Sequence, residues 1–280
     1  MEIVRTVEEL RQWSRARRKL GDTVGLVPTM GALHAGHSSL IRAAAKSCSR
    51  VAVSIFVNPT QFGPNEDFSR YPRTFEADCA LAEQEGAQVI FAPLVEEMYP
   101  QGATTFVDVE GLSERLDGHS RPGHFRGVAT VVTKLLVAAE ADRAFFGQKD
   151  AAQVAVLRRT AADLRLSTEI VVCPIVREPD GLALSSRNVY LSAQERKQAL
   201  TLSRAVRRVE ELAAQSERCA NVLVGAARAI FETEPSICVD YVELVDWATL
   251  EPVQVASPGT LFAVAARVGA TRLIDNTVFS

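Results

Sequence analysis

Features that mark a specialised class of protein are scarce in this sequence. Only 5 cysteines occur among 280 residues, they are scattered, and no Cys-x-x-Cys pair exists. The low and odd number argues against a disulfide framework and against a zinc cluster. This cysteine usage is typical of a reducing compartment, so we expect a cytoplasmic protein.

Long apolar runs and a charge bias are also missing. The longest apolar runs are far shorter than a membrane span, and no apolar stretch follows a basic start, so we expect no membrane insertion and no signal peptide. The formal net charge of -3 gives no general attraction to nucleic acid or to an anionic membrane. Basic clusters without interleaved aromatic residues argue against RNA binding as well.

The hydrophobic fraction of 47% is high enough for a substantial core, and 280 residues suit one large or two moderate domains. Apolar runs typical of buried strands alternate with helical patterns through the first part of the chain. The runs lie at 23–27, 51–57, 88–92, 142–146 and 168–172, and the helical patterns at 6–20, 36–47, 74–85, 125–139 and 150–162. This order predicts an α/β fold for residues 1–175, a Rossmann-like parallel sheet with helices on both faces.

The pattern changes after Pro174. Helical patterns cover 193–214 and 217–232, an alternating strand pattern covers 238–245, and two further runs at 260–268 and 271–278 flank a Gly-Ala turn. We therefore expect residues 176–280 to form a smaller C-terminal α+β domain.

The segment Pro28–His37 combines two glycines and two histidines between a predicted strand and a predicted helix. Backbone N–H groups point out of a helix start and hold phosphate, and histidine adds a donor that titrates near neutral pH. Neither the Walker phosphate loop nor the dinucleotide fingerprint is present, which weakens ordinary P-loop and nicotinamide interpretations.

Two more segments follow predicted strands, where open α/β sheets bind ligands. In Val57–Asn65, turn chemistry explains most residues but does not require Gln61. In Phe146–Gln153, Lys149 is a phosphate-ligand candidate beside a helix start, and Gln153 is expected to face the same crevice.

The remaining polar segments are less specific when each is considered alone. Arg177–Asn188 places two hydroxyls and a guanidinium in a loop that suits a clamp on a triphosphate, although taken alone it is better explained as a surface loop that caps the next helix. Arg121–Gly127 carries a histidine between cations before a predicted helix, and is either an anion contact or a helix-entry loop.

Together these segments closely resemble the pantothenate synthetase (pantoate–β-alanine ligase) family, whose members share a His-x-Gly-His loop with class I aminoacyl-tRNA synthetases. The resemblance runs from Pro28 to about Ser192 in order and spacing and continues more weakly beyond. It is carried by Pro-Thr-Met-Gly-Ala-Leu-His-x-Gly-His, Asn-Pro-x-Gln-Phe-Gly, Arg-Pro-Gly-His-Phe, Gly-Gln-Lys-Asp and Ser-Ser-Arg-Asn.

The resemblance implies functional roles for particular residues. ATP binding is implied for Met30, Gly31, Ala32, Leu33, His34, Ala35, Gly36, His37, Gly147, Gln148, Lys149, Asp150, Val176, Leu184, Ser185, Ser186 and Arg187. Catalytic roles are implied for His34, Lys149 and His37, the last as an acid. Pantoate binding is implied for Gln61 and Gln153, with Gln61 also near β-alanine. No protein ligand is assigned to the metal.

The resemblance also implies a two-step reaction with ATP as a substrate and Mg²⁺ as cofactor. Pantoate is adenylated with release of pyrophosphate, and β-alanine then displaces AMP to give pantothenate. A homodimer with a C-terminal lid domain is implied too, with small molecules as the partners. The sequence departs from the family at Thr60, Ala152 and Leu184, and none of these departures removes a group with a named chemical role.

Two other functions remain as alternatives at this stage. One is a nucleotidyltransferase that stops at a dinucleotide or CDP-linked product, which the amide pair Gln61 and Gln153 disfavours because amides suit a small hydroxy acid. The other is a non-catalytic nucleotide-binding or RNA-binding module.

Overall fold

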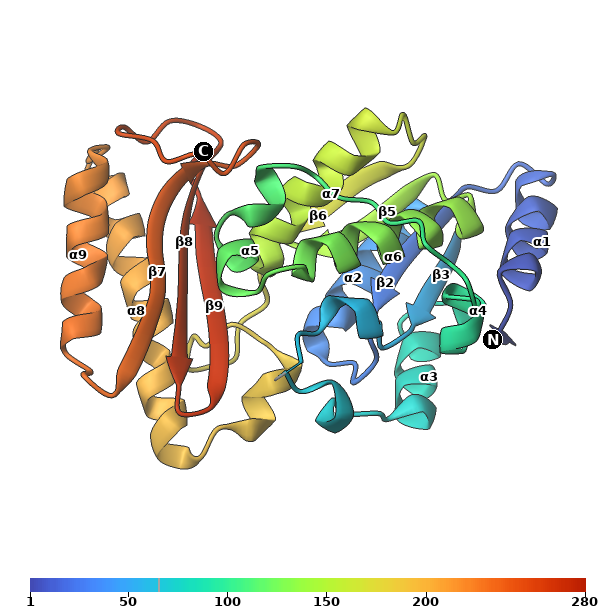
Figure 1. Cartoon of the computed structure of the whole chain (residues 1–280), viewed down its shortest axis with the longest axis horizontal. Coiled ribbons are helices and arrows are strands. Elements are labelled where there is room, and N and C mark those ends of the chain that lie inside the picture. The colour runs from blue at the N-terminus through green and yellow to red at the C-terminus, as the bar shows by residue number, and fades with distance from the viewer. Residues whose placement is uncertain (65) are drawn as a thin grey trace. The chain divides into compact units, whose positions relative to one another are not determined.

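A computed structural model describes residues 1–64 and 66–280, and it contains two compact units (Figure 1). The first unit comprises residues 1–114, 121–147 and 156–173, and the second comprises residues 115–120, 148–155 and 174–280. None of the helices in the described part of the chain is long and apolar enough to span a bilayer.

The first unit is built on a parallel six-stranded sheet in the order β1-β4-β3-β2-β5-β6. The strands are β1 (Glu2–Val4), β2 (Val24–Thr29), β3 (Arg50–Ile55), β4 (Val89–Phe91), β5 (Arg143–Gly147) and β6 (Glu169–Cys173). Five of these strands, β2 to β6, lie at the apolar runs and confirm the prediction of strands there. The sequence analysis missed β1, because three residues are too few to show a periodicity.

Helices cover both faces of this sheet, as the sequence predicts. They are α1 (Val7–Arg18), α2 (Ala35–Ser47), α3 (Phe75–Gln84), α4 (Val95–Met98) and α6 (His124–Ala139), while α7 (Ala151–Asp163) joins β5 to β6. The connections through α2 and α3 run across the sheet in one direction and those through α1 and α6 in the other. Right-handed crossovers therefore place these two pairs on opposite faces, and α1 indeed packs against α6.

Near-continuous apolar strands make the sheet the centre of the core. Val27, Val53 and Ile90 are fully buried under Ile41 of α2. Such strands, buried on both faces, are typical of parallel sheets between helix layers. The strand order reverses at β2, which pairs with β3 on one side and with β5 on the other. Ligands bind outside the carboxyl ends of strands at such a switch point.

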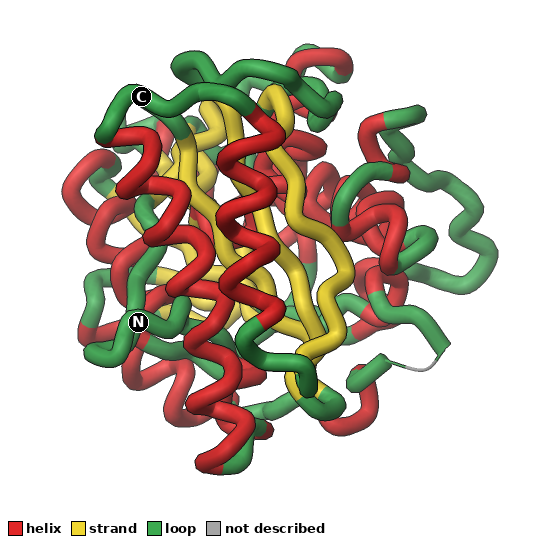
Figure 2. Tube along the Cα trace, turned by 90° about the vertical axis from the view of Figure 1, so that its left-hand side faces the viewer, coloured by secondary structure: helices red, strands yellow, loops and turns green. Residues whose placement is uncertain are grey.

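The second unit contains an antiparallel sheet of β7 (Ile237–Asp246), β8 (Thr260–Val268) and β9 (Thr271–Val278), in that order. Two long helices, α8 (Ala193–Ala214) and α9 (Ala220–Glu232), lie against this sheet (Figure 2). A short helix, α5 (Asp117–Ser120), also belongs to this unit. The predicted hairpin is confirmed, and Gly269 supplies the left-handed residue of its turn.

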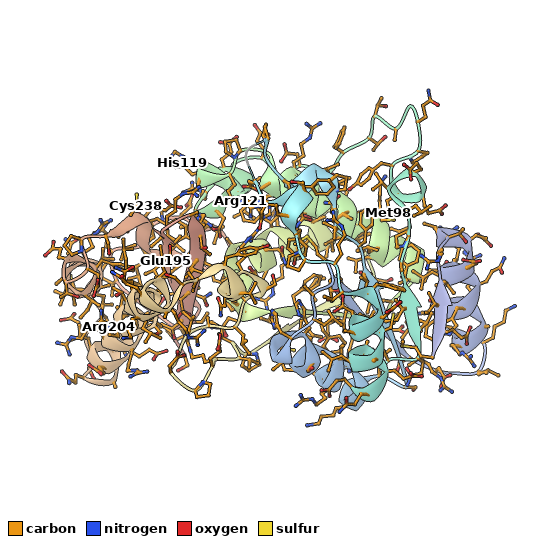
Figure 3. All side chains as sticks on the ribbon, turned by 90° about the horizontal axis from the view of Figure 1, so that it is seen from below. Met98, His119, Arg121, Glu195, Arg204 and Cys238 are labelled. Carbon is orange, nitrogen blue, oxygen red and sulfur yellow. The ribbon has the colours of Figure 1, made fainter. Side chains whose placement is uncertain are left out.

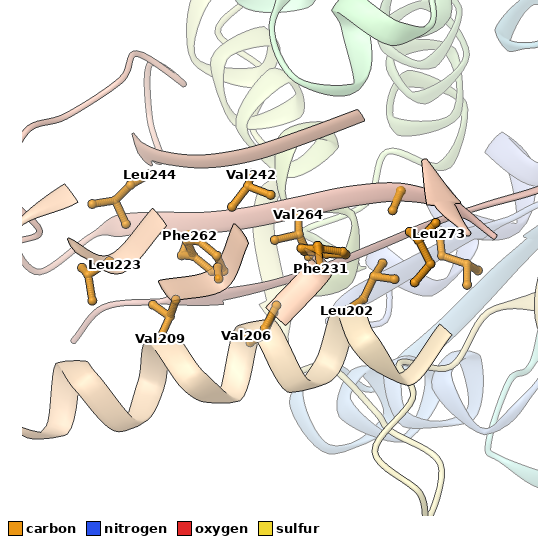
Figure 4. Packing of buried hydrophobic residues seen from close by; sticks show 14 of the residues in the cluster. Leu202, Val206, Val209, Leu223, Phe231, Val242, Leu244, Phe262, Val264 and Leu273 are labelled. Carbon is orange, nitrogen blue, oxygen red and sulfur yellow. The ribbon is translucent and has the colours of Figure 1, made fainter. Parts of the chain in front are cut away.

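The core of the second unit lies between α8 and the sheet. Leu202, Val206 and Val209 project from α8 toward Phe262 and Val264 of β8 (Figure 4). Their spacing of three or four residues places them on one helix face. A capping box between Ser192 and Glu195, the latter labelled in Figure 3, fixes the start of α8.

Candidate functional site

The loop that follows β2 turns sharply before α2 begins. Gly31 and Ala32 both have left-handed backbone angles, with φ of 84° and 51°. This region costs little for glycine but is unfavourable for alanine, so the turn needs support from its surroundings. Part of that support is local, because the N–H of Gly31 donates to Oγ1 of Thr29 over 3.1 Å.

A buried carboxylate on α3 holds the same turn from outside. Asp78 is only 3% exposed, and its two oxygens accept the N–H groups of Ala32 at 2.9 Å and Leu33 at 2.8 Å. The hydroxyl of Thr74 donates to it as well, over 3.0 Å. Sequence reasoning missed Asp78, since one acidic residue in a helix carries no signal that links it to a distant loop.

The two histidines of the loop cap α2 reciprocally. Nδ1 of His34 accepts the N–H of Gly36 over 3.1 Å, and Nδ1 of His37 accepts the N–H of His34 over 3.2 Å. The two rings lie 4.2 Å apart between centroids. Because each Nδ1 is an acceptor, the neutral rings carry their proton on Nε2. Both imidazoles are therefore fixed as Nε2–H donors at a helix N-terminus, where anions bind.

Gln61, at the end of the short 3-10 helix η1 (Pro59–Gln61), has its side-chain amide oriented by two neighbours. Nδ2 of Asn58 donates to Oε1 of Gln61 over 3.0 Å, and Nε2 of Gln61 lies 3.1 Å from Sδ of Met30. Asn58 is 1% exposed, and its own oxygen accepts from Tyr99. A thioether is a weak acceptor, so the Gln61 amide is presented chiefly as a donor.

The backbone of Gln61 is held by the Arg121–His124 segment. Arg121 NH1 lies 2.9 Å from Nε2 of His124, and Nδ1 of His124 lies 2.8 Å from the carbonyl oxygen of Gln61. A guanidinium can only donate, so Nε2 accepts and Nδ1–H donates to Gln61. Arg121, labelled in Figure 3, also binds Glu66 through two nitrogens. Burial would raise the pKa of Glu66, but the hydrogen bonds from Arg121 lower it below its ordinary value.

Helix α6 approaches η1 at a glycine. A Cβ on Gly127 would meet the carbonyl oxygen of Thr60 at 2.3 Å and Cα of Gln61 at 2.7 Å. The carbonyl of Gly127 also accepts from Nδ2 of Asn58 over 3.2 Å. The absence of a side chain at Gly127 therefore permits the contact that fixes Gln61.

In the second unit, the segment Gln148–Asp150 forms the 3-10 helix η4, and α7 follows it directly. Nζ of Lys149 lies 3.5 Å from Oδ1 of Asp150, and the lysine side chain is one-fifth exposed. Gln153 is half-buried in the first turn of α7. Trp247 donates its Nε1–H to the carbonyl of Ala151 over 2.9 Å, which satisfies one polar group near the helix start.

The loop between Val176 and η5 (Ser186–Tyr190) is folded back on itself. The N–H of Leu184 donates to the carbonyl of Val176 over 3.0 Å, and Ser185 caps η5 by accepting from the N–H of Arg187. Glu178 binds Nδ2 of Asn188 over 2.8 Å and Arg196 over 2.6 Å. These hydrogen bonds, the largest from Arg196, hold the pKa of Glu178 below its ordinary value.

The structure thus groups the predicted residues within each unit. In the first unit, Met30 through His37 lie in one turn with Gln61 in contact with Met30, and Gly147 ends the strand next to β2. In the second unit, Gln148 through Gln153 form one continuous start of a helix, and Val176 is bonded to Leu184 beside Ser185, Ser186 and Arg187. No group of three or more His, Cys, Asp or Glu side chains among residues 1–64 and 66–280 is arranged to hold a metal ion.

The parallel sheet, with its switch point and its histidine-capped helix after the central strand, defines a Rossmann-like enzyme of the nucleotide-handling class. The chain matches the family described as Pantoate-beta-alanine ligase over residues 2–278. It belongs to the pantoate–β-alanine ligase family.

Relatives and solved structures agree with this membership. A pantothenate synthetase of Acidobacterium capsulatum is 60% identical over 282 residues, covering 99% of this chain and 94% of its own. The pantothenate synthetase of Thermus thermophilus matches with a TM-score of 0.94 at 46% identity, over 99% of each chain. A pantoate-beta-alanine ligase of Francisella tularensis, complexed with beta-gamma ATP and beta-alanine, matches with a TM-score of 0.79 at 32% identity, over 99% of this chain and 97% of its own. The family and fold class expected from the sequence are confirmed.

The contact at Gly127 predicts an unusual response to alanine. Alanine normally stabilises a helix by about 1 kcal/mol relative to glycine. Gly127→Ala should instead lower the free energy of unfolding by about 1–3 kcal/mol, because the new methyl group overlaps backbone atoms of η1. The control is Gly225→Ala in α9, where a Cβ meets nothing within 4 Å and stability should rise. Urea denaturation of both variants measures this, and equal stabilisation by both would contradict the close contact.

The network around Glu178 predicts a pH-dependent contribution to stability. A carboxylate whose pKa is lowered by folding stabilises the protein above its unfolded pKa, and this contribution is lost as the pH falls through the lowered folded value. Glu178→Gln should cost about 1–2 kcal/mol at pH 7 and progressively less toward acid pH. Glu232→Gln, at an exposed position of α9, is the control. A cost for Glu178→Gln that stays constant from pH 7 to acid pH, measured by denaturation, would contradict it.

Proposed function

We propose that this chain catalyses the ATP-dependent condensation of (R)-pantoate with β-alanine to pantothenate through a pantoyl adenylate. In the first step a pantoate carboxylate oxygen attacks the α-phosphorus of ATP, and the bond to the β-bridging oxygen breaks to release pyrophosphate. In the second step the amine of β-alanine attacks the acyl carbon, the bond to the phosphate oxygen breaks, and AMP leaves. The amine loses a proton as the amide forms.

The observation that carries this proposal is the reciprocal histidine cap of α2. In-line attack builds negative charge on phosphate oxygens, and a fixed donor stabilises that charge without reorganising during the reaction. His34 and His37 are held as Nε2–H donors by their own Nδ1 hydrogen bonds. Adding a proton to Nδ1 of His37 would break its bond from the N–H of His34. The geometry therefore favours charge stabilisation by His37 over donation of a proton from an imidazolium.

The remaining ATP contacts are assigned residue by residue, as the family resemblance implies. Met30, Gly31, Ala32, Leu33, Ala35 and Gly36 supply the turn around the two histidines, and Gly147, Gln148, Asp150, Val176, Leu184, Ser185, Ser186 and Arg187 complete the set. Lys149 acts with the histidines as a cation on the phosphates. Support comes from the folded-back loop after Val176, which presents two hydroxyls and a guanidinium from one short segment.

Gln61 and Gln153 are assigned to pantoate, with Gln61 also beside β-alanine. The hydrogen bond from Asn58 occupies the Gln61 oxygen, so this amide offers its N–H groups to a ligand oxygen. Pantoate carries a carboxylate and hydroxyl groups, which accept from such a donor. A site built to donate at a fixed position discriminates strongly against a substrate that lacks the acceptor.

We assign Mg²⁺ to the nucleotide rather than to a protein cage. Mg²⁺ usually keeps several waters while binding substrate phosphates, so the phosphates of ATP are suitable ligands for it. The substrate is then MgATP. The free cysteines support a cytoplasmic location. The family resemblance is the basis for proposing a homodimer, which analytical ultracentrifugation tests.

The domain assignment extends this proposal. Residues 1–175 carry the pantoate residues and most of the ATP residues, and residues 176–280 supply the remaining ATP residues and act as a lid domain. An acyl adenylate hydrolyses when water reaches it, so a covering domain has a chemical reason to close on it. The helices α8 and α9 and the antiparallel sheet share a hydrophobic core of their own. This core supports the assignment of the C-terminal part as a separate domain.

Product analysis with each substrate omitted in turn tests the function, and Lys149→Ala tests the site. Pyrophosphate should form only when pantoate is present, and AMP should accumulate only after β-alanine is added. Lys149→Ala should raise the activation free energy of adenylation by about 3–4 kcal/mol, which is the effect of removing a preorganised donor from a transition state.

Two results would count against these assignments. Pyrophosphate release without pantoate would favour a nucleotidyltransferase of another kind, and no ATP turnover at all would favour a binding module. An unchanged single-turnover rate of adenylation in Lys149→Ala, with Lys46→Ala on the outer part of α2 as the control, would remove Lys149 from the phosphate site.

A further inference from the structure

Two neighbouring polar residues of β9 are deeply buried in the second unit. Asp275 is 2% exposed and Asn276 is 3% exposed. Buried polar groups are costly unless they are hydrogen-bonded. The hydrogen-bond partners of Asp275 and Asn276 therefore indicate the role of these two residues. Neither residue is marked by any motif in the sequence.

Asn276 binds the segment that carries Lys149. Its Nδ2 donates to two successive carbonyl oxygens, those of Gln148 at 3.0 Å and Lys149 at 2.9 Å. Its Oδ1 accepts from Nε2 of Gln148 over 3.2 Å. One side-chain amide thus holds the backbone on both sides of the Lys149 α-carbon. Since the backbone sets the direction of the Cα–Cβ bond, Asn276 also sets where the lysine side chain starts.

Asp275 fixes the backbone of Asn276 and binds a second segment, the one that contains Arg177. Oδ1 of Asp275 accepts the N–H of Asn276 over 2.8 Å. Its carboxylate also binds Arg177 through two hydrogen bonds, of 2.6 and 2.9 Å. Burial opposes the charge on Arg177, but the pairing with Asp275 raises the pKa of its guanidinium. Arg177 in turn donates to the carbonyl of Gly181, within the loop that leads to Ser185.

We infer that Asn276, whose backbone N–H is held by Asp275, is a positioning residue for Lys149 in the adenylation step. This inference rests on the proposed function. Asn276 touches backbone atoms of η4 and is assigned no contact with substrate, so it acts through the lysine that it holds. A misplacement of about 1 Å at a reacting group costs roughly a hundredfold in rate, which makes a rigid backbone anchor valuable at this position.

The test is a double-mutant cycle on the full-length enzyme. Asn276→Ala should slow single-turnover pyrophosphate release by roughly tenfold to a hundredfold. In a Lys149→Ala background the same change should slow it by less than about twofold, because the group being positioned is already gone. The kcat/KM for β-alanine, which reports only the second step, should stay within about twofold of the parent value.

Further variants separate positioning from a general role in folding. Asn276→Asp keeps the size of the side chain but turns an oxygen toward two carbonyls, so it should slow adenylation at least as much as Asn276→Ala. Asn276→Ser retains one donor and should slow it less. Arg267→Ala, at an exposed position on β8, is the control and should match the parent enzyme. Circular dichroism and the Tm establish that each variant is folded.

Several results would overturn the inference. A folded Asn276→Ala variant with the parent rate of adenylation would do so, as would an equal loss with and without Lys149. Loss of folding in all three Asn276 variants would assign the residue a purely structural role. A parent enzyme that releases no pyrophosphate with pantoate would instead refute the proposed function, and it is recognised before any variant is measured.

Discussion

The parallel pairing of β2 between β3 and β5 is the constraint on which the rest of the structure depends. Parallel strands end at the same edge of a sheet, so the segments that follow them start from neighbouring positions. The histidine turn leaves from β2, the Gln61 segment leaves after β3, and Gly147 ends β5. Polar groups collect at this edge without interrupting the apolar strands, whose side chains remain free to pack between two layers of helices.

Three of the segments assigned to the chemistry are held by side chains to which no role in it is assigned. Asp78 supports the left-handed turn before α2, and His124 fixes the carbonyl of Gln61. Asn276 holds the backbone around Lys149 in the second unit. In each of these three cases a buried polar side chain bonds backbone groups that lie far away in the sequence. Such bonds reduce the reorganisation that a transition state would otherwise require.

Local sequence patterns predicted most of the fold, and they predicted little of this supporting layer. Strand and helix periodicities are local, and so are the capping boxes that the structure shows at the starts of α1 and α8. The strand β1 was missed because its three residues become a strand only by pairing with β4. Asp78 and Asn276 could not be found, because their partners are backbone atoms brought near by the tertiary fold. The functional roles of the motif residues remain predictions that the variants above address.

The proposed function depends on attack of the pantoate carboxylate on the α-phosphorus of ATP. Its most direct test is to supply pantoate labelled with ¹⁸O in both carboxylate oxygens, together with MgATP and β-alanine, and to analyse the AMP by mass spectrometry. We expect one ¹⁸O atom in the phosphate of each AMP, because the attacking oxygen stays on phosphorus when the amine replaces it at the acyl carbon. Unlabelled AMP, or ADP with ¹⁸O in inorganic phosphate, would contradict it.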